Sequence, residues 1–358
     1  MKPLNWLLFA LLAIAGPLLF LPTPATPVAW TPPPPPTTDS GPFQRNQALA
    51  AMTRSAETLG IKGPEAITLD AQGNVLTGLL DGRIIRLSAD LTKMETLGNT
   101  GGRPLGMAYH PNGQLIVTDG KKGLLSLNPA DGKISVLATE ADGKEIRFAD
   151  DIVVSSDGKH AWFSDASTKW FYHQSTEAVM DHAADGRLLR HDFETGKTVT
   201  VLDGMEFANG VAFGPDESFL LVNETGAYRV RRLWLKGEKA GQNDMFLENL
   251  PGMPDNITFN GKDRFWIALF APRNPLLDGL AGWPGLRKAL IRITPYIPRP
   301  VERRAMALGY STEGKLVANL QDDGKGNYSP ITSVREGDGV LYFGSLSQTS
   351  VGRLPWKP

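Results

Sequence analysis

Short apolar runs separated by Gly, Asp and Asn dominate the chain after about residue 60. The recurring unit is a short apolar strand, a tight turn and a second apolar strand, as in "MAYHPNGQLIVTD" from Met107. Runs of this kind predict β-hairpins. Third strands often follow, as in "GRLLRHD". The pattern therefore predicts an all-β fold with many tight turns.

Six such units follow one another along the chain. They begin at Ile67, Met107, Ile152, Val211, Ile257 and Ser333. Six units over about 300 residues give roughly 50 residues each, which is the length of a propeller blade. We therefore predict a six-bladed β-propeller over residues 46–358, with the first strand of each blade lining a central channel. Residues 46–60 are expected to supply a strand that closes the ring. A β-sandwich is the alternative, but it fits six serial units less well.

The first 45 residues have a different composition. Apolar residues run from Leu4 to Leu21 with few interruptions, and Lys2 precedes them. About 18 apolar residues just span a bilayer, and a basic N-terminal flank favours a cytoplasmic N-terminus. We predict a signal anchor (transmembrane helix) over residues 1–22, a Pro-rich stalk over residues 23–45 and a propeller outside the cytoplasm, on the periplasmic or extracellular side. A secretory signal cleaved before Trp30 is the alternative, and the protein would then be secreted.

One position of the repeat carries polar side chains. Four of the six units have an oxygen-bearing residue two places before the strand begins, and equal offsets in a radial fold place these side chains at one height of the channel. Turn formation is the competing explanation, because Asp and Asn also mark turns. In chain order the six residues are Glu65, Leu105, Asp150, Asn209, Asp255 and Ile331.

Converging carboxylates repel one another unless a cation neutralises them. Carboxylate and amide oxygens are hard ligands, and Ca2+ accepts roughly six to eight of them in a flexible geometry. We therefore predict a Ca2+ site formed by the four polar residues of the repeat. Asn256 follows the last of them and can add a further oxygen.

Two long insertions, residues 166–185 and 271–290, follow second strands and are predicted to lie over the same mouth of the channel. Long loops in compact domains often form lids or binding loops. Their composition predicts an apolar small-molecule pocket above the cation, although a surface that faces a membrane or a protein partner would look similar. The residues expected to wall the pocket are Trp170, Phe171, Tyr172, His173, His182, Arg273 and Trp283.

Composition narrows the classes of function. A net charge of -1 over 358 residues provides no basic surface for nucleic acid. The absence of Cys excludes disulfides, thiolate metal sites and a cysteine nucleophile. The sequence contains no P-loop, no G-x-S-x-G and no H-E-x-x-H pattern.

Several motifs in order, including "FADDIVVSSDGKHAWFSD", "EFANGVAFGPDESFLLVNE" and "LENLPGMPDNI", resemble the strictosidine synthase-like family, and most closely its adipocyte plasma membrane-associated protein group. The resemblance covers about residues 63–354. It implies a six-bladed propeller related to paraoxonases and gluconolactonases, and a single-pass membrane arrangement. It also implies a channel calcium, with ligands at the positions of Glu65, Asp150, Asn209 and Asp255, and Asn256 matches the Asn beside the paraoxonase Asp.

Three positions depart from the family pattern. Asp150 stands where the family usually has Asn. Thr332 stands where strictosidine synthase has its catalytic Glu, and Leu105 where paraoxonase has a His. The resemblance therefore does not carry either relative's catalytic mechanism to this chain.

The function we expect is calcium-dependent hydrolysis of a small-molecule lactone or aryl ester. Ca2+ would polarise the carbonyl group, and a water activated by Asp150, Asp255 or His173 would attack it. One alternative is a non-catalytic, calcium-stabilised propeller that binds a ligand or partner. A further alternative is a strictosidine synthase-like enzyme that forms C–N or C–C bonds, against which Thr332 counts.

Overall fold

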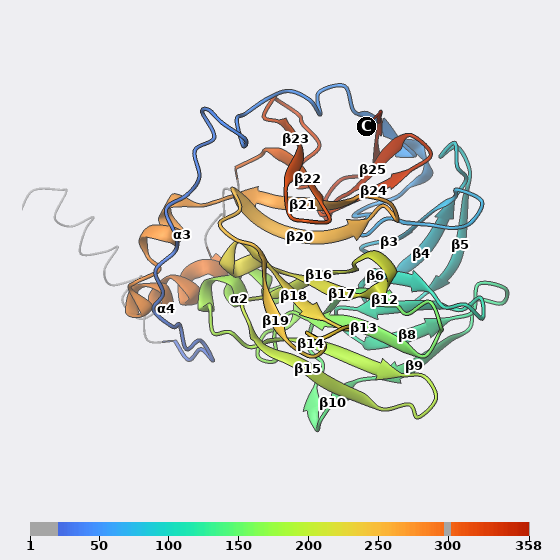
Figure 1. The fold of residues 1–358 in the computed structure, drawn as a ribbon, viewed down its shortest axis with the longest axis horizontal. Coiled ribbons are helices and arrows are strands. Elements are labelled where there is room, and N and C mark those ends of the chain that lie inside the picture. The colour runs from blue at the N-terminus through green and yellow to red at the C-terminus, as the bar shows by residue number, and fades with distance from the viewer. Residues whose placement is uncertain (1–20, 297–301, 358) are drawn as a thin grey trace, which may run out of the picture.

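The structure, a computed structural model, describes residues 21–296 and 302–357. Within these residues six four-stranded antiparallel sheets follow one another around a ring in chain order, so that the last blade lies beside the first (Figure 1). The predicted six-bladed propeller is confirmed. The predicted anchor falls almost entirely on residues outside the described part. Among the described residues, no helix has the length and apolar character needed to cross a bilayer.

Each blade runs from its innermost to its outermost strand in chain order, except the last. The first blade has β2 (Thr68–Leu69), β3 (Val75–Gly78), β4 (Arg83–Leu87) and β5 (Met94–Asn99). The second has β6 (Pro104–Tyr109), β7 (Leu115–Asp119), β8 (Gly123–Leu127) and β9 (Ile134–Ala138). The third has β12 (Ala149–Val154), β13 (His160–Asp165), β14 (Gly186–Asp192) and β15 (Thr198–Met205). The short hairpin of β10 (Glu140–Ala141) and β11 (Lys144–Glu145) precedes the third blade.

The remaining blades keep the same order. The fourth has β16 (Ala208–Phe213), β17 (Phe219–Glu224), β18 (Arg229–Trp234) and β19 (Asn243–Leu247). The fifth has β20 (Gly252–Phe259), β21 (Arg264–Pro272), β22 (Ala305–Ser311) and β23 (Leu316–Asp322). The sixth has β24 (Ser333–Gly337), β25 (Val340–Gly344), β26 (Val351–Pro355) and, outermost, β1 (Thr53–Ser55).

The sixth blade closes the ring. Its outermost strand β1 comes from the N-terminal side of the propeller and pairs with β26, with Thr53 opposite Arg353. The expected closing strand within residues 46–60 is therefore β1. This pairing covers the edge of β26, which would otherwise present unpaired backbone groups.

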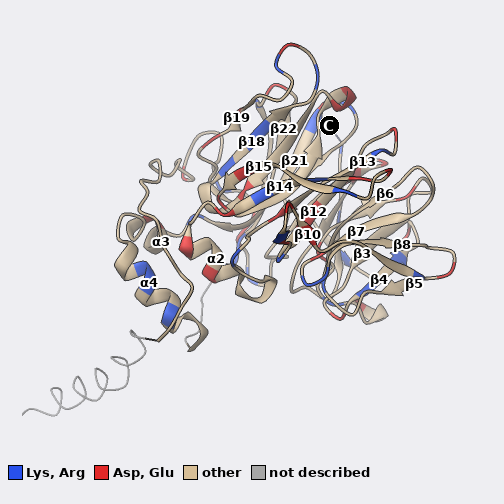
Figure 2. Ribbon diagram, turned by 90° about the horizontal axis from the view of Figure 1, so that it is seen from below, with Lys and Arg blue, Asp and Glu red and all other residues tan. Residues whose placement is uncertain are grey.

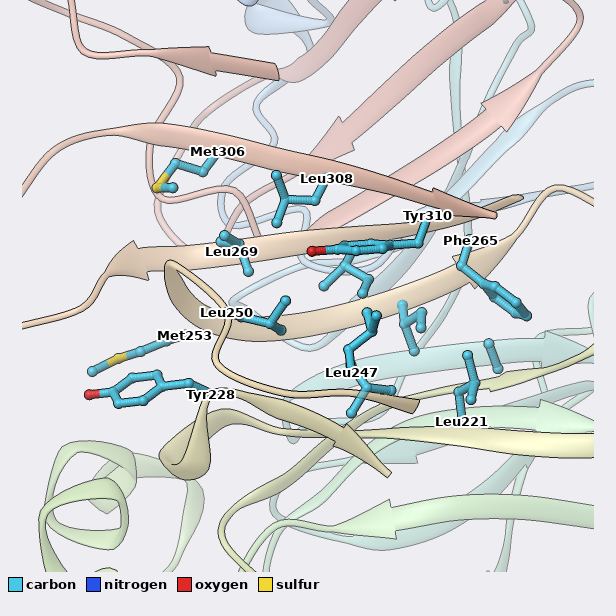
Figure 3. Close-up of a cluster of buried hydrophobic side chains, with 14 of the residues drawn as sticks. Leu221, Tyr228, Leu247, Leu250, Met253, Phe265, Leu269, Met306, Leu308 and Tyr310 are labelled. Atoms are coloured by element: carbon cyan, nitrogen blue, oxygen red, sulfur yellow. The ribbon is translucent and has the colours of Figure 1, made fainter. Parts of the chain in front are cut away.

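Apolar side chains from neighbouring blades fill the space between the sheets. In the cluster of Figure 3, Leu221 of the fourth blade packs in one cluster with Leu269 and Leu308 of the fifth, and all three are fully buried. Burying one such side chain contributes roughly 1.5–3 kcal/mol. The period-2 alternation of the strands thus supplies the contacts that hold blade against blade.

The two long insertions of the third and fifth blades form a lid at one end of the ring (left side of Figure 1). The first contains a 3-10 turn, η2 (Tyr172–Gln174), and helix α2 (Ser175–Asp181). The second contains α3 (Pro275–Gly279), α4 (Pro284–Ile293) and the turn η5 (Thr294–Tyr296). Both follow second strands, as the sequence predicts.

The Pro-rich segment, predicted as a stalk, lies against the propeller. Its carbonyl oxygens accept hydrogen bonds from the propeller: Arg273 Nη2 donates to Pro33 (2.8 Å) and Asn249 Nδ2 to Pro34 (3.0 Å). Proline lacks an N–H but keeps a strong carbonyl acceptor. The segment therefore packs along the propeller and its lid.

Candidate functional site

Four of the five predicted ligands occupy irregularities in the innermost strands, and the fifth, Glu65, precedes β2. The pairing of β12 with β13, of β16 with β17 and of β20 with β21 skips residues 150–151, 209–210 and 255–256, respectively. The pairing of β6 with β7 skips residues 105–106 in the same way. A β-bulge takes residues out of the ladder and re-aims their side chains. In the second to fifth blades the repeated offset in the sequence is therefore a repeated bulge at one height of the channel.

Two glycines allow the innermost strands to approach each other at this height. A Cβ atom on Gly210 would lie 2.6 Å from the carbonyl oxygen of Asp255, closer than real Cβ contacts come. A Cβ atom on Gly344 would overlap the carbonyl oxygen of Glu65. Glycine is the residue that permits such backbone contact. The ring is therefore narrow where the polar side chains meet.

The structure brings the four polar residues of the repeat to the floor of one cavity of about 630 Å3. The side chains of Glu65, Asp150, Asn209 and Asp255 are buried in its floor, with 2–6% of each residue exposed. Asn256 lies behind them and donates a hydrogen bond from Nδ2 to Glu65 Oε1 (2.9 Å). All five predicted ligands therefore lie together, at the lid end of the channel.

The carboxyl groups of this cluster are perturbed by burial and by one another. Burial raises the pKa of Glu65 to about 7, and the neighbouring Arg103 opposes this shift. Burial also raises the pKa of Asp150 well above its usual range, and the charges of Glu65 and Asp255 add to the effect. The pKa of Asp255 is raised for the same reasons, first burial and then Glu65. Negative charge at this point is costly unless a cation balances it.

Several oxygens of the cluster have no hydrogen-bond partner. Glu65 Oε2, Asn209 Oδ1 and Asn256 Oδ1 are buried and unpaired, whereas buried oxygens in proteins are normally bonded. Hard, unpaired oxygens fit a Ca2+ or Mg2+ ion. Within residues 21–296 and 302–357, no group of three His, Asp or Glu side chains is arranged so that it could hold a metal by itself. Amide oxygens and water would therefore have to complete the coordination.

Arg103 is a residue of this site that the sequence analysis missed. Its side chain is fully buried, and Nη1 donates to the carbonyl oxygen of Gly63 (3.0 Å). Its charge lowers the pKa of both Glu65 and Asp150, so it lies near both carboxylates. In the sequence, its place in "GRPLG", two residues before the bulge of β6, could have indicated that it belongs to the site. Arg side chains are seldom fully buried, however, so the sequence offered little reason to place it in the channel.

Asp151 is a second missed residue, next to a predicted ligand. Its Oδ2 accepts a hydrogen bond from the backbone N–H of Val211 (2.9 Å) and thereby joins the third blade to the fourth. Burial raises its pKa to about 7. The two consecutive acids have different roles because the bulge turns only Asp150 toward the cavity.

Three of the seven residues predicted to wall the pocket do line the cavity, namely Tyr172, His173 and Arg273. They share the walls with apolar side chains that include Phe148 and Phe207. His173 is exposed at the rim, and its ring stacks on Phe171 at 6.1 Å. Its place at the rim separates it from the buried carboxylates of the floor.

The other four predicted wall residues do not line this cavity. Trp170 is buried in the core, where Nε1 donates to Asp181 Oδ2 (3.0 Å). His182 is stacked against Trp30 at 4.1 Å, outside this cavity. Phe171 and Trp283 are exposed, at 40% and 63%. The prediction was wrong for these residues because an aromatic side chain in a lid serves equally as core, wall or outer surface.

The chain is similar in sequence to known proteins. Residues 42–274 match the family model described as the SMP-30/gluconolactonase/LRE-like region. The chain belongs to this family. The adipocyte plasma membrane-associated protein of Rattus norvegicus is 34% identical over 337 residues, which cover 88% of this chain and 88% of that protein. Strictosidine synthase-like 10 of Arabidopsis thaliana is 32% identical over 314 residues, covering 80% and 83%. The resemblance seen in the motifs is confirmed.

Solved structures of other proteins share the fold. A gluconolactonase of Xanthomonas campestris superposes with a TM-score of 0.62 at 16% identity and covers 94% of this chain and 99% of its own. The calcium-binding protein regucalcin of Agrobacterium tumefaciens superposes with a TM-score of 0.57 at 14% identity, covering 85% and 93%. At these identities the likeness shows the propeller fold.

Proposed function

We propose that the protein hydrolyses small lactones or aryl esters at the floor of the lid-covered cavity, with Ca2+ as its cofactor. The observation that carries the proposal is the cluster of buried, mutually repelling carboxylates with unpaired oxygens beneath an apolar-walled cavity. A gluconolactonase and a calcium-binding regucalcin among the structural neighbours support it.

The four residues of the repeat would hold the cation, namely Glu65, Asp150, Asn209 and Asp255. Asn256 orients the first of them through its hydrogen bond to Oε1. When bound, the cation supplies Lewis-acid polarisation of a substrate carbonyl. The Asn209 amide is held for this role by the donation from Nδ2 to Thr225 Oγ1 (3.2 Å), which leaves Oδ1 free.

The remaining chemistry belongs to side chains of the chain itself. Phe148, Phe207 and Met253 line the cavity and would bind the apolar part of a substrate and exclude water. Asp150 or Asp255 would accept a proton from the attacking water, because both carboxylates lie at the cavity floor where the cation would bind. His173, at the rim, is the second candidate for that proton.

Hydrolysis of phenyl acetate and a small set of lactones tests the proposal. The full chain should hydrolyse at least one of them, and a chelator should abolish the activity. Asp255→Asn removes a carboxylate of the cluster while nearly preserving its shape, and should abolish the activity too. Asp263→Asn, at an exposed turn on the opposite end of β20, is the matched control and should change nothing. Activity that survives both chelator and Asp255→Asn would contradict the proposal.

A binding function is the second candidate, and two buried positions favour it. Leu105 is 2% exposed and offers no acid–base group. Thr332 is fully buried and its Oγ1 donates to the carbonyl oxygen of Glu65 (2.9 Å), so it is committed to the backbone. A protein that is inactive on the whole panel, but whose melting temperature falls when a chelator is added, would be a calcium-stabilised binding propeller. The same role of Thr332 weighs against a strictosidine synthase-like reaction.

A further inference from the structure

Helix α4 exposes apolar side chains at its N-terminal end, whereas Ile291 near its C-terminal end is buried. Trp283, at the N-terminal cap, is 63% exposed and Leu286 is 55% exposed. Arg287, in contrast, is 3% exposed. A surface helix of a soluble protein normally turns its apolar stripe inward and its charges outward. In α4 the arrangement at these positions is reversed.

The buried Arg287 explains how the reversal is stabilised. Its guanidinium group donates to the carbonyl oxygens of Met180 (2.8 Å from Nε), Val28 (2.8 Å) and Ala281 (3.2 Å). These contacts tie α4 to α2, to its own preceding loop and to the N-terminal segment. Buried hydrogen bonds therefore fix the orientation of α4 that exposes Trp283.

The exposed apolar residues of the lid lie close together along the chain. Of the nine large hydrophobic residues that are exposed in the described part of the chain, four fall between residues 276 and 296. We call this set the lid face: Leu276, Trp283, Leu286 and Tyr296, which are 55–66% exposed. Trp and Tyr are the residues enriched where proteins meet the membrane–water interface.

Charge on the same segment matches a membrane surface. Residues 273–296 contain four basic residues and one acidic residue. Of the four basic residues, Arg273 and Arg287 are buried, whereas Lys288 and Arg292 are partly exposed on α4, which is marked by basic residues in Figure 2. Basic residues beside an apolar surface favour binding to anionic lipid headgroups.

The N-terminal segment also contacts α4. Arg292 Nε donates to the carbonyl oxygen of Leu21 (2.7 Å), and Leu21 is the last residue of the apolar run that begins at Leu4. Insertion of that run in a bilayer would therefore hold the C-terminal turn of α4 next to the headgroups. Leu276 and Leu290 also line the cavity, so its opening adjoins the lid face.

We infer that the lid face rests on the surface of a phospholipid membrane, so that the cavity opens toward the lipid interface. An amphipathic helix in this position inserts its apolar side roughly 5–10 Å into the boundary between headgroups and acyl chains.

The absence of Cys from the chain makes a site-specific test straightforward. The full chain is reconstituted in vesicles of phosphatidylcholine with phosphatidylglycerol, and carries one spin label at Trp283→Cys or Leu286→Cys. Val136→Cys is the matched control, because Val136 is 61% exposed on β9, on the opposite side of the molecule from α4 in Figure 1. Depth is read from collisions with oxygen and with a water-soluble nickel complex.

The labels at 283 and 286 should report a depth of roughly 5–10 Å, while the label at 136 should report bulk water. Adding Leu286→Asp, at an exposed position that does not threaten the fold, should move the label at 283 into water. Labels at 283 and 136 with equal exposure to the nickel complex would overturn the inference. So would dipolar broadening at 283 that grows with protein density, which would indicate a second copy on this face. A label hidden from both reagents would mean that the chain's own N-terminal segment covers the face, and would overturn it too.

Discussion

Calcium affinity should depend steeply on pH, because the predicted ligand Glu65 has a pKa of about 7 without the cation. Calcium binds the ionised carboxylate, so protonation competes with it. About nine-tenths of Glu65 would be ionised at pH 8 and about one-tenth at pH 6. The dissociation constant should therefore be at least roughly tenfold larger at pH 6, a difference of about 1.4 kcal/mol. Asp150 and Asp255, whose pKa values are also raised, should steepen the dependence.

The stability of the calcium-free protein should have the opposite dependence on pH. The pKa of Glu65 is higher in the folded protein than the ordinary 4.5. Between about pH 4.5 and pH 7 the folded state therefore binds more protons than the unfolded state, so stability decreases as the pH rises. Calcium should offset this loss most strongly above pH 7. The melting temperature with and without calcium, measured from pH 5 to pH 8, should thus show two curves that diverge.

Isothermal titration calorimetry of the full chain in detergent at pH 6, 7 and 8 provides the affinity. Glu65→Gln cannot be protonated in this range, so it should bind calcium more weakly at pH 8 and show a smaller change with pH. Glu194→Gln, at an exposed turn after β14, is the matched control and should behave like the wild type. Equal affinities at pH 6 and pH 8 in the wild type would refute the assignment of Glu65 as a ligand.

Three further substitutions test the structure around the site. Arg187→Met leaves the buried carboxylate of Asp165, now paired with Arg187 at 2.6 Å, without its partner, and should cost roughly 3–5 kcal/mol in urea unfolding; a loss below about 1 kcal/mol would contradict the pairing. Gly210→Ala forces two innermost strands apart. It should increase the dissociation constant for calcium by at least about tenfold, while the far-ultraviolet circular dichroism spectrum stays the same. Unchanged calcium binding would show that close contact between these strands is not required. Trp30→Ala removes the stacking on His182, worth roughly 0.5–1.5 kcal/mol beyond area burial, and should speed amide hydrogen exchange in residues 26–32; unchanged exchange would mean that the segment is held by its hydrogen bonds alone.

The blades and the polar cluster could be predicted because both repeat along the chain. Six hairpins of similar length fix the blade number, and four polar residues at one offset fix a ring of side chains. The physical cause of that offset, a bulge that skips residues 150–151 and their counterparts, is not visible in the sequence. The register nevertheless preserves it, since pairing resumes in four blades at the residue that begins the repeat, namely Met107, Ile152, Val211 and Ile257.

The contributions of the second blade and of the lid could not be predicted in the same way. Leu105 marks the second blade as apolar at the shared offset, yet Arg103 two residues earlier supplies the blade's charge to the site. Trp170 and Trp283 lie in lid insertions of similar composition, but one is buried and the other exposed. Which of the two occurs depends on partners distant in sequence, such as the carboxylate of Asp181 under Trp170.

The central claim is that Glu65, Asp150, Asn209 and Asp255 bind a divalent cation. Its most direct test is a crystal structure from crystals grown with calcium and measured for anomalous scattering. The account predicts one anomalous peak at the cavity floor, with oxygens of the four polar residues of the repeat at about 2.3–2.6 Å from it. A well-ordered cavity floor with no anomalous peak would contradict the account. In that case Arg103 alone would balance the carboxylates, and calcium would be found only at carboxylates on the protein surface.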